Sequence, residues 1–304
     1  MYDIIIIGAG PAGLTAAIYA RRAEKSVLLI EKETFGGQIT HSPRVENYPG
    51  FITLSGSELG EKLLEHAMAQ GADIELDTVC GISGSKGHFT VTTDGGAFEG
   101  KSVIIATGSK HRTLGIAGED KFTGEGISYC AVCDGAFYKG KSVVIIGGGN
   151  SALQEAVLLS EGCSTVTVVQ NLPFLTGEAK LQEILRGRSN VKVILSSVVE
   201  SIIGDEEFCG IKIKNTESGE ISALYADGMF VAIGQKPENE AFSDVVALNE
   251  YGYVVAGEDC LPMGAAEGIF VAGDCRTKAI RQVTTATADG ATAAIAACRF
   301  IDGL

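Results

Sequence analysis

The run Ile4-Ile5-Ile6-Ile7 leads directly into Gly8-Ala9-Gly10-Pro11-Ala12-Gly13, after which an alanine-rich stretch begins. A short β-branched strand, a glycine turn and a helix follow one another in this order in dinucleotide-binding units. In such a turn Gly8 permits the reversal, Gly10 lets a pyrophosphate approach the backbone, and Gly13 lets the helix pack on the strand. The stretch therefore predicts the first βα unit of a nucleotide-binding α/β domain.

A carboxylate at the end of the next expected strand strengthens this interpretation. Val27 to Ile30 forms a second apolar run, and Glu31 follows it. A carboxylate at this place binds the ribose hydroxyls of an adenine dinucleotide. A glycine turn alone is weak evidence, but the turn together with Glu31 indicates a dinucleotide site.

The pattern of strand, glycine turn and helix occurs a second time in the middle of the chain. Val143 to Ile146 leads into Gly147-Gly148-Gly149-Asn150-Ser151-Ala152, and a helical stretch continues through Ser160. Two glycine turns that follow two strands imply two dinucleotide sites. The fold class expected is α/β, with two Rossmann-like domains.

The remaining apolar periodicity completes the expected set of elements. We expect strands over residues 73–79, 88–93, 103–106, 164–169, 191–196, 210–214, 229–233 and 269–272, and helices over 53–70 and 282–300. Polar, glycine-containing segments at 110–118 and 234–237 are the expected linkers between domains.

Composition limits the classes of partner. The chain has 304 residues, 45% of them hydrophobic and 20% charged, which is ordinary for a globular protein with proper cores. Its formal charge of −14 argues against nucleic acid or an anionic membrane as the main partner. The start of the sequence has no basic leader, and no apolar run has the length of a membrane span, so we expect a cytoplasmic protein.

Two cysteines stand two residues apart in Tyr129-Cys130-Ala131-Val132-Cys133-Asp134-Gly135. Inside cells such a pair is usually half of a zinc site or a redox dithiol. Zinc would need a second pair of ligands, whereas the other cysteines stand singly and the histidines are scattered, so we expect no metal. Two buried cysteines acting as small hydrophobes are the other alternative, but the Asp-Gly that follows suggests an exposed turn. We favour a dithiol for which Asp134 carries protons.

These motifs together resemble the low-molecular-weight thioredoxin reductases, and the resemblance spans nearly the whole chain. The stretches that carry it are Gly8 to Gly13, Gly36-Gly37-Gln38, Glu46 to Gly50, Ala106-Thr107-Gly108, Cys130 to Gly135, Gly147 to Ala152, Gly273-Asp274 and Arg281-Gln282. A dithiol just before the second glycine turn is specific to that family and its near relatives.

The resemblance implies an FAD domain made of two sequence segments, with a nucleotide domain inserted between them. The expected segments are residues 1–112 and 243–304 for the FAD domain and 113–242 for the pyridine-nucleotide domain that carries the dithiol. It also implies a rotation of one domain on the other, with the two linkers as hinges.

The resemblance implies roles for individual residues as well. Cys133 would face the flavin, Cys130 would attack the disulfide of the partner, and Asp134 would move the proton. The residues implied for FAD are Gly8, Gly10, Pro11, Ala12, Glu31, Lys32, Gly37, Gln38, Asn47, Val79, Thr107, Gly108, Gly273, Asp274, Arg281, Gln282 and Val283. Those implied for a pyridine nucleotide are Gly147, Gly149, Asn150, Ser151, Ala152 and Gln170.

The sequence departs from the family where a cofactor phosphate would bind. Relatives that use NADPH carry His-Arg-Arg and a further Arg where this chain has Gln170, Asn171, Leu172 and Thr176. A 2′-phosphate brings nearly two negative charges and calls for cations. We therefore predict that NADPH is not the preferred donor, although Gln170 and Asn171 could bind the ribose of NADH. Gln154 also replaces a glutamate of the family.

Three functions remain open at this point. The first is a thioredoxin reductase fed by NADH or by a weakly bound pyridine nucleotide, and the second is a thioredoxin reductase fed by another carrier such as ferredoxin. The third is a flavin oxidase that forms disulfides in small molecules. A flavoprotein that only binds a partner would leave Asp134 unexplained. Thioredoxin, or a thioredoxin-like protein, is the expected partner, and a homodimer is implied by the resemblance alone. For Cys275 the ordinary interpretation is a buried small residue.

Overall fold

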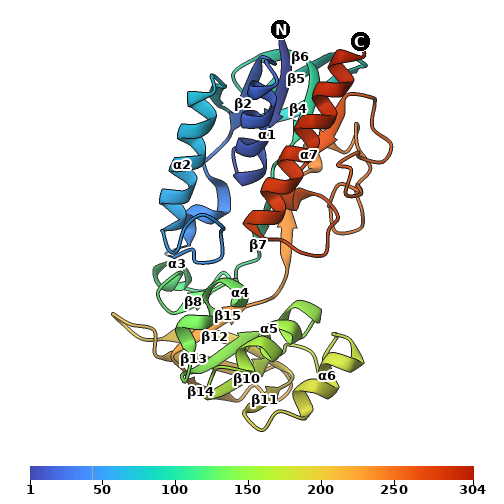
Figure 1. Ribbon diagram of the computed structural model, residues 1–304. Helices are drawn as coiled ribbons and strands as arrows, with labels where there is room; N and C mark the ends of the chain where they lie inside the picture. Colours follow the sequence, from blue (N-terminus) through green and yellow to red (C-terminus); the bar gives the residue numbers. More distant parts are fainter. Residues whose placement is uncertain (43) are drawn as a thin grey trace. The chain divides into compact units, whose positions relative to one another are not determined.

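The computed structural model describes residues 1–42 and 44–304, and the chain divides into two compact units (Figure 1). The discontinuous unit comprises Met1–Lys110 and Lys236–Leu304, and the inserted unit comprises His111–Gln235. The domain ends expected from the sequence, 112 and 242, lie a few residues beyond these divisions. A discontinuous unit with one insertion is the organisation that two copies of a dinucleotide fold imply.

The discontinuous unit begins with the strand, turn and helix that the opening stretch predicts. Its first segment contains β1 (Tyr2–Ile7), α1 (Pro11–Arg22), β2 (Val27–Glu31), η1 (Gly37–His41), α2 (Gly56–Ala69), β3 (Asp73–Leu76), β4 (Val79–Ser85), β5 (His88–Thr93) and β6 (Ala97–Ile105). Its second segment contains η3 (Glu240–Phe242), β17 (Ile269–Val271), η4 (Gly273–Cys275) and α7 (Val283–Asp302).

The sheet of this unit has the order β3-β2-β1-β6-β5-β4, and β17 also pairs with β6. Strands β3, β2, β1, β6 and β17 are parallel, while β4, β5 and β6 are antiparallel. Side chains of β1 alternate between two cores, as the two-residue period of a strand requires. Ile4 and Ile6 pack with α1 and α7, whereas Ile5 and Ile7 pack with Phe89 of the β4–β6 ribbon.

Helices α1 and α7 lie side by side, although nearly the whole sequence separates them (Figure 1). Small residues make the contact: a Cβ at Gly290 would lie 2.1 Å from the carbonyl oxygen of Ala12. No side chain fits between backbones this close. The alanine-rich character of the last helix is therefore a packing requirement.

The inserted unit repeats the architecture of the first. Its elements are α3 (Glu119–Phe122), β8 (Ile127–Ser128), α4 (Ala131–Asp134), η2 (Gly135–Tyr138), β9 (Ser142–Ile146), α5 (Asn150–Ser160), β10 (Thr165–Val169), α6 (Ala179–Arg186), β11 (Val191–Ile194), β12 (Ser197–Ile203), β13 (Gly210–Asn215), β14 (Ile221–Tyr225) and β15 (Gly228–Val231). A parallel sheet of order β11-β10-β9-β15-β8 carries helices on one face and the antiparallel sheet β12-β13-β14 on the other. The repeat predicted from the two glycine turns is thus also a repeat of fold.

The segments that cross between the units pair with each other as β7 (Ser109–His111) and β16 (Gln235–Pro237). Both crossings fall within the segments expected to be linkers, and strand pairing makes them ordered connections. No helix within residues 1–42 and 44–304 is long and apolar enough to cross a membrane.

Two expected strands are clearly wrong in their extent, and one of them, 103–106, covers only the end of the longer strand β6. Residues 73–79, expected as a single strand, form β3 and the start of β4, with Asp77 and Thr78 between them. The Asp77 carboxylate accepts the backbone N–H groups of Thr78 and Gly95. A side chain that binds the backbone in this way competes with strand pairing, so the chain leaves β2 and pairs with β5 instead.

Candidate functional site

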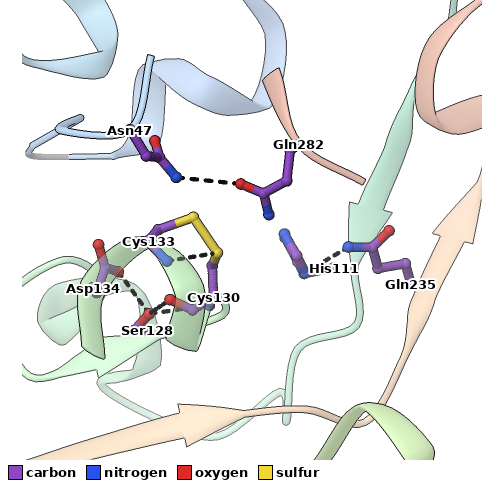
Figure 2. Close-up of a disulfide and its surroundings, with 8 residues drawn as sticks. All are labelled: Asn47, His111, Ser128, Cys130, Cys133, Asp134, Gln235 and Gln282. Atoms are coloured by element: carbon purple, nitrogen blue, oxygen red, sulfur yellow. Dashed lines mark hydrogen bonds between the residues drawn. A yellow bond between two sulfur atoms is a disulfide. The ribbon is translucent and has the colours of Figure 1, made fainter. Parts of the chain in front are cut away.

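Cys130 and Cys133 are joined by a disulfide at the start of the short helix α4 (Figure 2). Cys130 is the residue before the first turn, and its Sγ accepts the N–H of Cys133 at 3.2 Å. The residues between the cysteines face different ways, since Val132 is 59% exposed while Ala131 is buried in the core of the inserted unit. The exposed turn expected here is in fact a helix anchored on one side.

Asp134 lies to the left of the disulfide in Figure 2 and is hydrogen-bonded to Ser128 of β8, the strand before the dithiol. The hydroxyl of Ser128 donates to Oδ2 of Asp134 at 2.6 Å, and the N–H of Cys130 donates to the same hydroxyl oxygen at 3.1 Å. Burial raises the pKa of Asp134, and the Ser128 hydrogen bond opposes that rise. A carboxyl with a raised pKa beside a dithiol is suited to hold and release a proton.

The first glycine turn has the geometry that its residues predict. Gly8 has a φ of 104°, and a Cβ there would lie 2.4 Å from the carbonyl oxygen of Ala106. A Cβ at Gly13 would lie 1.9 Å from the carbonyl oxygen of Gly8, so Gly13 permits the close packing of α1 on β1. Gly10, by contrast, faces open space within 4 Å. The turn thus holds the helix start open above Gly10.

Glu31 lies beside this turn, where the sequence predicted it. Its Oε2 accepts the N–H of Ala9 at 2.7 Å, and Oε1 accepts the N–H groups of Lys32 and Glu33 at 2.9 Å. These bonds fix the carboxylate at the end of β2. The Lys32 ammonium pairs with Glu238 at 2.5 Å.

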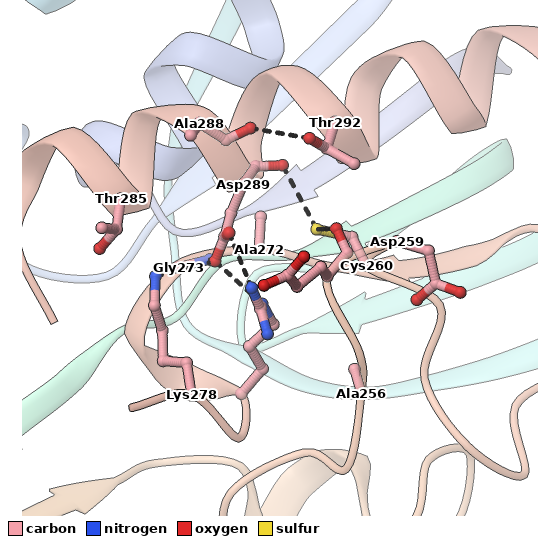
Figure 3. Close-up of polar contacts among 12 residues, drawn as sticks. Ala256, Asp259, Cys260, Ala272, Gly273, Lys278, Thr285, Ala288, Asp289 and Thr292 are labelled. Atoms are coloured by element: carbon pink, nitrogen blue, oxygen red, sulfur yellow. Dashed lines mark hydrogen bonds and ion pairs between the residues drawn. The ribbon is translucent and has the colours of Figure 1, made fainter. Parts of the chain in front are cut away.

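A second loop of the same unit is built around one buried acid of α7, Asp289 (Figure 3). Its carboxylate accepts the N–H of Gly273 at 3.0 Å, pairs with both Arg276 and Lys278, and is 7% exposed. Burial opposes ionisation of Asp289, but the hydrogen bonds and charges of Arg276 and Lys278 outweigh it and hold its pKa below the ordinary value. The cluster fixes the backbone of residues 273–278.

Asp274 stands in this fixed loop and has an unsatisfied atom. Its Oδ1 is buried with no hydrogen-bond partner among the described residues. Burial raises its pKa to about 6, although Lys278 and Arg281 oppose the rise. Buried polar atoms normally have partners. An orphaned acceptor in a loop and open space above Gly10 fit a dinucleotide that carries hydroxyl groups and phosphates, so the discontinuous unit fits FAD.

Other residues predicted for FAD fall in the same unit but have varied contacts. The Asn47 amide donates to the Gln282 side chain at 3.3 Å, and the Thr107 hydroxyl donates to Asn239 at 2.9 Å. Arg281 stacks on the ring of Tyr253 at 4.3 Å. Pro11 and Ala12 begin α1, Gly37 and exposed Gln38 begin η1, Val79 begins β4, Gly108 follows β6, and Val283 begins α7.

The second glycine turn precedes α5 in the inserted unit. Gly147 has a φ of 130°, and a Cβ there would lie 2.4 Å from the carbonyl oxygen of Ala232. Gly149, Asn150, Ser151 and Ala152 form the start of the helix, with Ala152 buried and Ser151 exposed. Gln170 is 4% exposed, and its side chain packs directly on Gly148.

The comparisons with known proteins agree with this geometry. The sequence profile described as "Pyridine nucleotide-disulphide oxidoreductase" matches residues 2–290. The thioredoxin reductase of Listeria monocytogenes is 40% identical over 100% of this chain and 95% of its own length. The chain belongs to the low-molecular-weight thioredoxin reductase family.

Solved structures of that family match along the whole chain. The thioredoxin reductase of Streptococcus pyogenes superposes with a TM-score of 0.94 at 36% identity, covering 100% of this chain and 99% of the other. A ferredoxin-flavin thioredoxin reductase from Clostridium acetobutylicum matches with a TM-score of 0.54 at 32% identity, covering 100% and 99%. As a member of the family, this chain is a flavoprotein disulfide oxidoreductase with a Cys130–Cys133 disulfide.

Several residues of this thioredoxin reductase site were missed by the sequence analysis. Asp289 is an acid in the middle of an alanine-rich helix, and that isolation is a signal that could have identified it. Ser128 carries no such signal, because its role depends on the return of α4 onto β8. Within residues 1–42 and 44–304, no three His, Cys, Asp or Glu side chains gather as metal ligands.

Proposed function

We propose that this chain is an FAD-dependent thioredoxin-disulfide reductase that passes electrons from the flavin through Cys130 and Cys133 to thioredoxin, with a donor other than NADPH. In this proposal Cys133 exchanges electrons with the flavin, Cys130 attacks the disulfide of thioredoxin, and Asp134 supplies and removes the proton. Family membership and the contacts of Asp134 support these roles.

FAD in the discontinuous unit would supply the two electrons. The residues that would hold it are the Gly8–Gly13 turn, Glu31 and the loop at Asp274. The helix N-terminus after the turn favours a pyrophosphate. Oδ1 of Asp274 has the Lys278 ammonium 3.8 Å away but no hydrogen-bond partner among the described residues, so it could accept a hydrogen bond from a hydroxyl group.

The segment after β10 carries the argument about the donor. Residues 170–178 read Gln-Asn-Leu-Pro-Phe-Leu-Thr-Gly-Glu and contain no Lys or Arg. Gln170 is held inside the segment: its Nε2 donates to the carbonyl of Phe174 at 3.3 Å, and its Oε1 accepts the N–H of Asn171 at 3.2 Å. The side chain that could bind a ribose is therefore already occupied by its own loop.

The same segment is fastened to the glycine turn. The carbonyl oxygen of Gly148 accepts the N–H groups of Thr176 and Gly177, both at 2.9 Å. Asn150, the first residue of α5, exchanges hydrogen bonds with Glu178 at 3.2 and 2.7 Å. The charge beside the helix N-terminus is thus an acid of the chain itself, and it repels a phosphate.

Magnitudes support the exclusion of NADPH. A hydrogen bond to a charged group contributes about 1.5–3 kcal/mol, and about 1.4 kcal/mol changes an affinity tenfold. The loss of two arginine contacts to a 2′-phosphate therefore weakens NADPH by roughly two to four orders of magnitude. NADH lacks that phosphate and escapes this loss.

A ferredoxin donor is the second candidate. The supporting observation is the full-length match to a solved chain described as a ferredoxin-flavin thioredoxin reductase. A protein donor needs no pyridine nucleotide, so the cation-free segment would have no cost. The formal charge of −14 opposes docking of an acidic ferredoxin.

An anaerobic titration tests the proposal. The purified holoenzyme is mixed with NADPH, NADH or reduced ferredoxin, and bleaching of the flavin absorbance is followed. We expect bleaching by NADH or by ferredoxin at low micromolar concentration, and NADPH should need at least a hundredfold more. Equal bleaching by NADPH would overturn the donor argument. Fast reoxidation in air coupled to oxidation of small dithiols would favour the oxidase instead.

A further inference from the structure

The second turn of α5 carries a carboxyl group that the proposed reaction does not use. Glu155 faces α4, where the backbone N–H of Ala131 forms a hydrogen bond with its carboxyl group. Ala131 is the residue directly after Cys130 and is 2% exposed. On the same side of α5, Leu159 lies against Gly135, where a Cβ would be 2.9 Å from Leu159 Cδ2. Helix α5 therefore supports the helix that holds the disulfide, and Glu155 is the acid at this contact.

One oxygen of the Glu155 carboxyl group, Oε2, is buried and has no hydrogen-bond partner in the described part of the chain. Burial raises the pKa of Glu155 to about 7, and the Ala131 N–H opposes the rise. A carboxyl group with one free buried oxygen is more stable neutral than charged unless a donor compensates it.

Neighbouring charges do not account for the raised pKa of Glu155. The titratable groups on the elements packed against α5 are Asp134 on α4, Tyr138 on η2, and Lys180, Glu183 and Arg186 on α6, while β9 and β10 carry none. None of them contributes to the shift of the Glu155 pKa. The charge that would act on Glu155 is one that the disulfide form lacks, namely that of a thiolate at Cys130 or Cys133.

We propose that Glu155 is a positioning residue of the dithiol, whose carboxyl group takes up a proton when the disulfide is reduced and releases it when the disulfide forms again. This inference rests on the proposed function, because it needs a disulfide that cycles. Glu155 acts through the backbone of α4 and through its charge.

The step balances in atoms and charge. The S–S bond accepts two electrons from the reduced flavin and breaks, so one sulfur becomes a thiolate and the other takes a proton and becomes a thiol. The new negative charge disfavours ionised Glu155, and the carboxylate takes a second proton from solvent. When the dithiol reduces a disulfide of the partner, two electrons and two protons leave. The S–S bond then forms again, and Glu155 is ionised again.

The sign of the effect follows from this linkage. In the disulfide form Glu155 loses its proton near pH 7, and in the reduced form it does so at higher pH. Between these two pH values, reduction of the disulfide therefore binds one extra proton. As the pH rises, the dithiol form becomes less stable relative to the disulfide, and Glu155 makes this change steeper.

The test replaces the carboxyl group by its neutral isostere, Glu155→Gln, in the holoenzyme. The dithiol fraction is measured by alkylation in dithiothreitol buffers of fixed oxidised-to-reduced ratio from pH 6 to pH 9. The dithiothreitol ratio at half reduction is compared between wild type and variant at each pH. From pH 6 to pH 9 the dithiothreitol ratio at half reduction should change by up to about tenfold more in wild type than in Glu155→Gln. This factor corresponds to one pKa unit of coupling.

Controls separate this role from a structural one. Glu183→Gln changes an exposed acid on α6, which also packs on α5, and should leave the wild-type profile unchanged. Parallel profiles of wild type and Glu155→Gln would overturn the proposal. If Glu155→Gln does not fold, Glu155→Asp should keep the steep profile and Glu155→Ala should flatten it, and any other order contradicts the proposal. Dithiothreitol replaces both donor and thioredoxin, so a failure of the donor argument would leave this result intact.

Discussion

The hydroxyl of Ser128 donates to Oδ2 of Asp134 at 2.6 Å, while Oδ1 of the same carboxylate is buried without a partner in the described chain. The same serine oxygen accepts the N–H of Cys130. One small side chain therefore connects the strand before the dithiol to the acid after it.

Replacement of Ser128 by Ala should shift the pH profile of disulfide reduction. The Ser128 hydrogen bond stabilises ionised Asp134 against its burial, so its loss raises the pKa of Asp134 further. The limb of the kcat profile that reports this carboxyl group should move to higher pH. Asp134→Asn should remove that limb and lower kcat by about a hundredfold or more. A Ser128→Ala profile identical to that of wild type would contradict this assignment.

Replacement of either Cys130 or Cys133 by Ser should leave a yellow protein that does not reduce disulfides. The cysteines lie in the inserted unit and the predicted FAD residues lie in the discontinuous unit, so flavin binding does not depend on them. Flavin absorbance and thioredoxin reduction are measured together. Cys209→Ser, at an exposed single cysteine, is the control and should remain fully active. Activity in either dithiol variant would defeat the dithiol hypothesis.

Cations introduced after β10 should increase the use of NADPH. The variant Asn171→Arg with Leu172→Arg places two guanidinium groups in the segment where the proposal expects a 2′-phosphate to lie. We expect the NADPH concentration for half bleaching to fall by roughly tenfold or more, with little change for NADH. Lys substitutions at exposed Ser222 and Ala223 of β14 add the same two charges elsewhere in the unit and control for net charge.

Asp289→Asn should destabilise the discontinuous unit. The change leaves the buried Arg276 guanidinium without its carboxylate, a loss that typically costs about 3–5 kcal/mol. Asp302→Asn, in the last turn of the same helix, removes an exposed pair with Lys25 and should cost less than about 1 kcal/mol. Urea unfolding measures both. If both variants lose a similar free energy of unfolding, the buried cluster contributes no more to stability than the exposed ion pair.

The stability contributed by Asp289 should also depend on pH in a defined direction. The pKa of this carboxyl group is lower in the folded chain than in the unfolded chain. Its contribution is therefore complete above the unfolded pKa, roughly 3.9, and is lost as the pH falls through the lower folded value. Urea unfolding between pH 6 and pH 3 should show a steeper loss for wild type than for Asp289→Asn.

FAD binding should weaken in mild acid through Asp274. Without FAD the pKa of this carboxyl group is about 6, and a hydroxyl that donates to the carboxylate would lower it. The affinity for FAD is then highest above pH 6 and falls as the pH drops below that value. Fluorescence titration of the deflavinated chain with FAD measures this, and Asp274→Asn should bind FAD more weakly with a flatter pH dependence.

Local patterns in the sequence predicted much of this fold. Both glycine turns, the strands before them and the helices after them lie where the residues indicated, because a turn of this kind is specified by a few neighbouring positions. The interruption at Asp77 was not predicted, because it depends on a side chain that binds the backbone of a distant residue, Gly95. Propensity over a short window contains no such contact.

The candidate site was predicted less completely than the fold. The dithiol and Asp134 are adjacent in sequence, and that proximity identified them. Glu155 and Ser128 join them only because α5 and β8 pack around α4, and Arg276 meets Asp289 only because the loop after β17 folds back on α7. Contacts of this kind come from tertiary structure, which a linear pattern does not contain.

The pairing of α1 with α7 has a consequence for biosynthesis. During translation the inserted unit leaves the ribosome with all its strands, whereas the first Rossmann half still lacks β17 and α7, which are made later. Until then the apolar face of α1 has no lasting cover, so the nascent chain must be shielded by chaperones or by transient contacts. We therefore expect this unit to capture its flavin only after α7 has been made.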